Sequence, residues 1–111
     1  MMIATKKHTK FRSPCPIART LDVLGDKWTL VIMRDALFFN RRTFAEFERS
    51  GEKIPTNLLT DRLKKLVDFG LMEKVQYQTH PVRYRYEPTA MANELKPILR
   101  SIKRFGEKNL S

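Results

Sequence analysis

The sequence predicts one mainly helical domain that carries a small β-hairpin near its C-terminal end. Apolar residues recur at helical spacing in several segments between residues 16 and 69, and again after residue 89. In residues 71–88 the period changes to the alternation that is typical of strands. A chain of 111 residues is long enough for one modest core and too short for two.

Two helices are expected to open the folded part of the chain. The segment "CPIARTLDVLG" places Pro16 at a first helical position and Gly25 just past the helix end. Asp26 can cap the next segment, "KWTLVIMRDALF", which is apolar on most sides and is therefore expected at the centre of the core. Residues 1–13 lack such a pattern, and we interpret them as a flexible basic arm ahead of a domain over residues 14–111.

A third and a fourth helix follow, each with a local start signal. Thr43 and Glu46 stand three apart in "TFAE", the spacing of a capping box, and predict a short helix over residues 44–50. Pro55 suits the first turn of the fourth helix because its fixed φ fits there, and Gly70 suits its end.

The remaining elements are a hairpin and a last helix. "LMEKVQY" and "RYRYEP" are β-prone, and "QTHPV" between them predicts the hairpin tip. Thr89 can cap a final helix from Ala90 to about Asn109, which Pro97 should kink. Packed helices followed by a two-stranded wing are the winged helix-turn-helix plan, which is the fold that the sequence predicts.

The fourth helix has a polar face that an apolar core does not explain. Short hydrogen-bonding side chains stand at its front and lysines further back: Thr56, Asn57, Thr60, Lys64 and Lys65. A DNA major groove admits such a helix, so the front residues can reach base edges and the lysines can bind phosphates. The further DNA ligands that we expect are Arg83 and Arg85 of the hairpin, and Arg41 and Arg42 ahead of the third helix. Tyr84 and Tyr86 alternate with the hairpin arginines and are expected to face inward.

The same polar face also has a plainer interpretation as solvated surface. Asp61 would repel phosphate, and it can instead accept from a cytosine or pair with Lys65 one turn later. Arg62 falls within the apolar arc and is expected to pair with an acid of a neighbouring helix. The capped helix before this face and the basic hairpin after it favour DNA contact over the plainer interpretation.

The last helix carries an apolar seam. Its members recur at spacings of four, three, four and three: Met91, Leu95, Ile98, Ile102 and Phe105. They could simply cover the core of one subunit, but Leu99 and Leu110 add a second apolar edge. We therefore expect an isologous dimer built from the terminal helices, with Ile17 and Leu21 of the first helix also in the interface. A two-fold dimer predicts a pseudo-palindromic operator with half-sites about 10 base pairs apart.

Four segments together resemble the HxlR-type winged helix-turn-helix regulators, close to the MarR group: "CPIARTLDVLGDKW", "NRRTFAEFE", "LLTDRLKKLVDFGLMEK" and "YRYEPTAMANELKPIL". The similarity runs from Cys15 to Phe105. It implies a homodimeric bacterial transcription factor, often a repressor of a neighbouring gene, with outer helices forming the dimer. Asn40 stands where the family usually has glycine, and Pro55 where it often has a serine cap.

Cys15 is the one thiol of the chain. At a helix N-terminus the dipole and free N–H groups favour a thiolate, and Arg12 and Arg19 are close enough in sequence to help. The resembled family includes thiol-based sensors of electrophiles and oxidants, which implies such a role for Cys15. An inert, half-buried cysteine is the alternative.

The overall charge restricts the class of partner. Lys and Arg number 22 against 12 Asp and Glu, and the net charge of +10 favours nucleic acid first and an anionic membrane surface second. Neither a membrane-spanning run nor the hydrophobic part of a signal peptide is visible, so we expect a soluble, cytoplasmic protein. The sequence shows no catalytic set, no phosphate loop and no metal cluster, so we expect neither an enzyme nor a cofactor.

The sequence therefore predicts a sequence-specific DNA-binding transcriptional regulator that acts as a homodimer and represses. A basic domain that coats RNA or DNA without sequence preference is the main alternative, and on single strands it would need exposed aromatic rings for stacking. A winged helix that binds only proteins would be expected to lack the cations of the fourth helix and the hairpin.

Overall fold

The structure, a computed structural model, describes residues 11–111, so most of the expected N-terminal arm lies outside the described residues. Its elements are α1 (Pro16–Leu24), α2 (Thr29–Phe38), α3 (Phe44–Glu48), α4 (Thr56–Asp68), β1 (Met72–Thr79), β2 (Val82–Pro88), α5 (Ala90–Asn93) and α6 (Leu95–Asn109). The two strands form one antiparallel hairpin. The predicted fold class, mainly helical with a small β wing, is thereby confirmed. Within the described residues, no helix is long and apolar enough to cross a membrane.

The core forms around α2, as its all-round apolar sequence predicts. Ile32, Met33 and Ala36 of α2 are fully buried, and so are Phe47 of α3 and Leu59 of α4. Burial of the four larger side chains of this set stabilises the fold by about 1.5–3 kcal/mol each. The core thus holds α3 and α4 in fixed positions against the same central helix.

The predicted end signals of the first and third helices are confirmed. Thr43 and Glu46 form the complete capping box at the start of α3. Gly25 follows the end of α1, where a Cβ would stand 2.4 Å from the carbonyl oxygen of Leu21. Asn40 takes a left-handed φ of 59°, a conformation that asparagine tolerates and glycine adopts freely. That backbone conformation explains why asparagine can stand at a position where glycine is usual in the resembled family.

The ends of α4 depart little from expectation. Pro55 has a φ of −56° and a ψ of 139° and precedes the helix, which begins at Thr56. At the other end Gly70 has a φ of 82°, and the N–H of Leu71 donates to the carbonyl of Leu66 over 2.9 Å. This pairing satisfies a free carbonyl of the last turn and directs the chain into β1.

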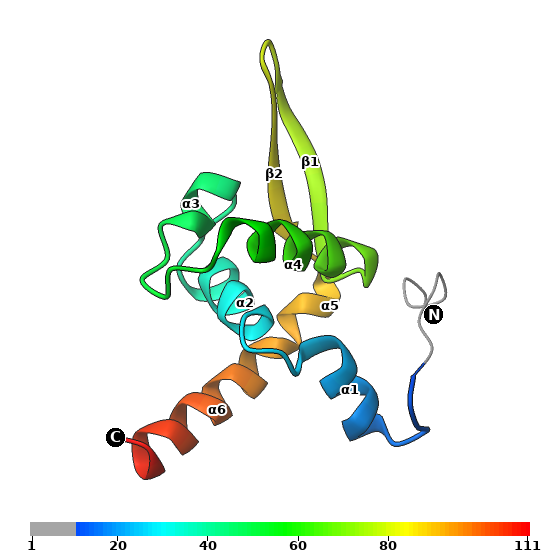
Figure 1. Cartoon of the computed structure of the whole chain (residues 1–111), viewed down its shortest axis with the longest axis vertical. Coiled ribbons are helices and arrows are strands. Elements are labelled where there is room, and N and C mark those ends of the chain that lie inside the picture. Colours follow the sequence, from blue (N-terminus) through cyan, green and yellow to red (C-terminus); the bar gives the residue numbers. More distant parts are fainter. Residues whose placement is uncertain (1–10) are drawn as a thin grey trace.

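The hairpin projects from the helical body (Figure 1). Tyr86, near its base, packs edge-on against Phe47 with ring centroids 6.5 Å apart, so the prediction that Tyr86 faces inward is confirmed. Tyr84 lies two residues nearer the tip and remains 42% exposed, so its expected inward orientation is wrong. The two tyrosines share a face of the strand, but that face has no body to pack on beyond the hairpin base.

The last helix is broken rather than kinked. Thr89 caps α5, which ends at Asn93, and α6 begins afresh at Leu95. Pro97 lies in the first turn of α6, where proline is tolerated. In one continuous helix its ring would clash with the carbonyl four residues earlier. From there α6 leads away from the hairpin (Figure 1).

Candidate nucleic-acid interface

The helix α4 lies across the base of the hairpin, with α3 close by (Figure 1). Its buried face presents Leu59, Leu63 and Leu66 to the core, which fixes the rotation of the helix about its own axis. Arg62 adds a polar tie, because its Nε donates to Asp26 Oδ2 over 2.8 Å. The prediction that Arg62 pairs with an acid of a neighbouring helix holds in part, because Asp26 stands in the turn just ahead of α2.

Asp26 connects α4 to the start of α2. Its carboxylate accepts from the backbone N–H groups of Trp28 and Thr29 over 3.1 and 3.2 Å, as the predicted cap requires. Partial burial by itself would raise the pKa of Asp26. Hydrogen bonds from the Thr29 hydroxyl, Arg62 and the Trp28 N–H outweigh that effect and lower this pKa to about 2.

The opposite face of α4 is open to solvent at four of the five expected positions: Thr56, Asn57, Thr60 and Lys64. The Thr56 hydroxyl donates to Glu48 over 3.0 Å, and the Thr60 hydroxyl donates to the Thr56 carbonyl over 3.0 Å. Asn57 is exposed, and within residues 11–111 its amide has no hydrogen-bond partner. An amide of this kind can donate and accept at once, which suits the N6 and N7 edge of adenine.

Lys65 and Asp61 both contact other groups of the protein. Lys65 is half-buried, and its ammonium lies 3.4 Å from the carbonyl oxygen of Asp22 in α1. The carboxylate of Asp61 pairs with neighbouring Arg62 and not with Lys65. Lys64 is the α4 lysine that points outward, although Asp68 lies 3.5 Å from its ammonium.

The arginines ahead of α3 are turned toward the protein. Arg42 donates from Nη1 to the carbonyl of Ala36 over 2.7 Å and from Nε to Glu87 over 3.2 Å. Arg41 donates from Nη1 to the carbonyl of Glu46 over 2.9 Å. These contacts hold both guanidinium groups against the protein, and those of Arg42 tie β2 to α2. That the pair binds phosphate stays a prediction.

The two hairpin arginines differ from each other in their partners. Arg85 donates from Nε to Glu87, which also accepts from Arg42. Arg83 is exposed, and the part of the chain that the structure describes gives its guanidinium no partner. Arg83 is therefore the better placed of the two to bind a phosphate.

A groove between the start of α3 and the hairpin holds residues that sequence reasoning missed. It has a volume of about 530 Å³, and Thr43, Lys74, Tyr77, Arg83 and Tyr84 are among its lining residues. The ammonium of Lys74 lies 4.4 Å from the ring centroid of Tyr84. The signal for Lys74 was its place in a predicted wing strand, while Tyr77 sits at an irregularity in strand register that the sequence does not mark.

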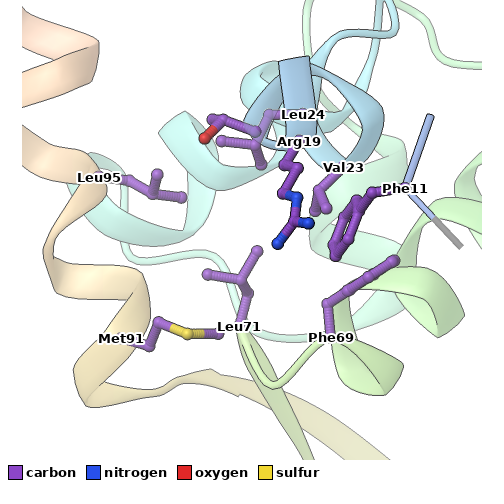
Figure 2. A pocket seen from close by; sticks show the side chains of 9 residues that line it. Phe11, Arg19, Val23, Leu24, Phe69, Leu71, Met91 and Leu95 are labelled. Carbon is purple, nitrogen blue, oxygen red and sulfur yellow. The ribbon is translucent and has the colours of Figure 1, made fainter. Parts of the chain in front are cut away.

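Cys15 is exposed and stands immediately before α1. The arginines expected to assist its thiol have other partners. Arg12 forms an ion pair with Asp22 over 2.7 Å, and Arg19 donates to the carbonyl of Ser13 over 2.9 Å. Figure 2 shows the Arg19 side chain pointing into an apolar pocket of about 230 Å³, where its guanidinium lies 5.1 Å from the ring centroid of Phe11.

Comparison with known proteins decides the family. Residues 23–111 match the family described as HxlR-like helix-turn-helix. This chain belongs to the HxlR family. Several relatives that this chain matches are named HTH-type transcriptional regulators.

Individual relatives agree with the assignment. The uncharacterized HTH-type transcriptional regulator MT3179 of Mycobacterium tuberculosis is 34% identical over 94 residues, which are 85% of this chain. This HxlR-family chain spans 58% of the length of that relative.

Two solved structures share the fold. PA1607, described as a candidate transcription factor, has a TM-score of 0.81 and 36% identity, and the match covers 90% of this chain and 68% of that one. The redox regulator HypR in its oxidized form has a TM-score of 0.74 and 31% identity, over 87% of this chain and 99% of that one.

Proposed function

We propose that this HxlR-family protein is a homodimeric cytoplasmic repressor that reads a pseudo-palindromic DNA duplex with α4 and the hairpin of each subunit. The observation that carries the proposal is the exposed arc of α4 beside the hairpin, with the amide of Asn57 at its front, unpaired among residues 11–111. Thr56 and Thr60 would read neighbouring base edges, while Lys64 and Arg83 would bind phosphates. Lys65, Arg41, Arg42 and Arg85 are left out of the contact set because they are half-buried and also bonded to protein groups.

Dimerisation through the terminal helices is supported by large apolar side chains that one subunit leaves in solvent. The set comprises Ile17 and Leu21 of α1, Met91 of α5, and Ile98, Ile102 and Phe105 of α6. Phe105 alone is 61% exposed, and large apolar side chains left in solvent in such number are typical of association surfaces. Leu95 does not belong to this set, because it is 6% exposed and packs in the core of its own subunit.

We also propose that modification of the Cys15 thiol changes the affinity of the protein for DNA. Two observations support it: Cys15 is exposed, and the related HypR is described as a redox regulator. With one cysteine in the sequence, the response would be alkylation, oxidation, a mixed disulfide, or a bridge between the two Cys15 residues of a dimer. Because Cys15 adjoins α1, such a change would act on the proposed dimer interface.

One observation favours a second candidate function. Tyr77 and Tyr84 expose their rings next to Lys74 and Arg83 on the hairpin, and exposed rings beside cations can stack bases of a single strand. A basic domain that coats RNA or DNA without sequence preference would use the same groove.

A titration of the purified protein separates these functions. Duplex DNA from the region upstream of its own gene is compared with random duplex and random single strand at two salt concentrations. The proposal predicts a preference of roughly 10³-fold or more for one duplex site. Equal and steeply salt-dependent binding to every nucleic acid would instead support the coating function.

A further inference from the structure

A second groove lies between the end of α2 and α6, on elements that the DNA-binding proposal does not use. We call it the Phe38–Arg100 groove, and its lining residues are Arg34, Phe38, Phe39, Leu99, Arg100 and Lys103. It has a volume of about 430 Å³, within the range of roughly 300–1,000 Å³ that is usual for small-molecule sites. Because α6 leads away from the hairpin (Figure 1), a ligand there would not occupy the proposed DNA surface.

The walls of the Phe38–Arg100 groove are apolar. Phe38 ends α2 and Phe39 follows it, and both rings are exposed, Phe39 by 58%. Leu99 of α6 lies half-buried on the opposite side. Two adjacent phenyl rings in water cost free energy in one subunit, and an apolar ligand on them would remove that cost.

The cations at the rim are not equivalent. Arg34 donates to Asp35 over 2.9 Å and to Glu52 over 3.1 Å, and Lys103 pairs with Glu107 over 3.1 Å. Arg100 has no carboxylate partner among residues 11–111, and its guanidinium lies 5.4 Å from the ring centroid of Phe38. One guanidinium with free donors therefore stands directly beside the apolar wall.

We propose that the Phe38–Arg100 groove binds a small amphipathic carboxylate. The apolar body of the ligand, a ring system or a short acyl chain, would lie against Phe38, Phe39 and Leu99. Its carboxylate would accept paired N–H bonds from Arg100, the geometry that a guanidinium favours. Lys103 would add positive charge at the rim. This inference does not depend on whether the protein reads a specific DNA sequence.

Isothermal titration with simple probes tests the proposal. Naphthalene-2-carboxylate and octanoate distinguish a ring system from an acyl chain, and naphthalene-2-carboxamide keeps the ring while it removes the charge. We expect one saturable site per chain for at least one carboxylate, and at least about tenfold weaker binding of the amide. Arg100→Gln should weaken carboxylate binding by at least about tenfold, and Phe38→Ala should weaken binding of the carboxylate and the amide alike.

Two matched variants locate the site. Arg104→Gln removes the same charge from an exposed position of α6 that does not line the groove, and it should leave affinity unchanged within about twofold. Arg19→Gln alters the smaller pocket beside α1, and it should also leave affinity unchanged. Absence of saturable binding by both carboxylates would overturn the proposal, and so would equal affinity for carboxylate and amide. A loss that follows Arg19→Gln and not Arg100→Gln would overturn it as well.

Discussion

Arg62 of α4 and Asp26 ahead of α2 are joined over 2.8 Å by a charge-assisted hydrogen bond. The same oxygen of Asp26 accepts from the N–H of Thr29 over 3.2 Å, where α2 begins. One carboxylate thus caps the central helix of the core and anchors the helix that carries the proposed reading surface. Because the anchor stands on the core side of α4, it fixes which side chains of this helix face outward.

Asp26→Asn should therefore destabilise the fold by about 1–2 kcal/mol, a range reduced because the carboxylate is partly exposed. The pKa of Asp26 is lowered from 3.8 to about 2 in the folded protein. Its contribution to stability is then fully present above about pH 4 and is lost as the pH falls through about 2. Urea denaturation between pH 2 and 6 should show this loss in the native protein. The same slope in Asp26→Asn would show that other groups cause it.

The phosphate contacts are tested by Lys64→Ala and Arg83→Ala. Each variant should weaken binding to all duplexes and reduce the slope of log affinity against log salt by about 1. The reason is that the variant neutralises one phosphate fewer and so releases fewer counterions from the DNA on binding. Lys108→Ala removes an exposed cation from the far end of α6 and serves as the matched control. A salt slope that falls equally in all three variants would assign the effect to net charge and not to the proposed surface.

Two substitutions in α6 should distinguish a residue of the proposed dimer interface from a residue of the core. Ile102→Glu is expected to convert a dimer into a monomer in sedimentation velocity while the fold is retained, since Ile102 is exposed in one subunit. Leu95→Ala, in contrast, should lower the free energy of unfolding by about 2–5 kcal/mol because it leaves a cavity in the core. A dimer that persists in Ile102→Glu would contradict the assignment of this face.

The sensor proposal is tested by Cys15→Ser. A quinone should lower the affinity of the native protein for its operator, and the serine variant should bind equally well with and without the quinone. Intact-mass measurement gives the number of adducts per chain, which should be one. A native protein that carries the adduct and keeps its affinity would show that the thiol is reactive but has no regulatory role.

The order of the elements and most of their ends could be predicted because their signals are local. The capping box of Thr43 and Glu46, the glycine at position 70 and the alternation after it each act within a few residues. The break between α5 and α6 was harder to predict from the sequence. Pro97 marks a disruption there. Whether the chain kinks or starts a new helix depends on how Leu95 packs in the core.

The candidate site was predictable in its location and less so in its members. Arg42 and Lys65 look like phosphate ligands in sequence, yet their partners, Glu87 and the carbonyl of Asp22, lie more than forty residues away along the chain. Sequence spacing cannot show such partners, because only the packing of the elements brings them together. Asn57 and Lys64 kept their expected exposure because the periodicity of α4 alone determines it.

The affinity of Asn57→Ala for an operator, relative to its affinity for random duplex, tests the central claim most directly. The operator is selected from a random duplex pool with the native protein, and both affinities are measured at one salt concentration. We predict that the preference for the operator falls by about 10-fold or more, while affinity for random duplex stays within about twofold. An unchanged preference would contradict the proposal that α4 reads DNA bases through its exposed arc.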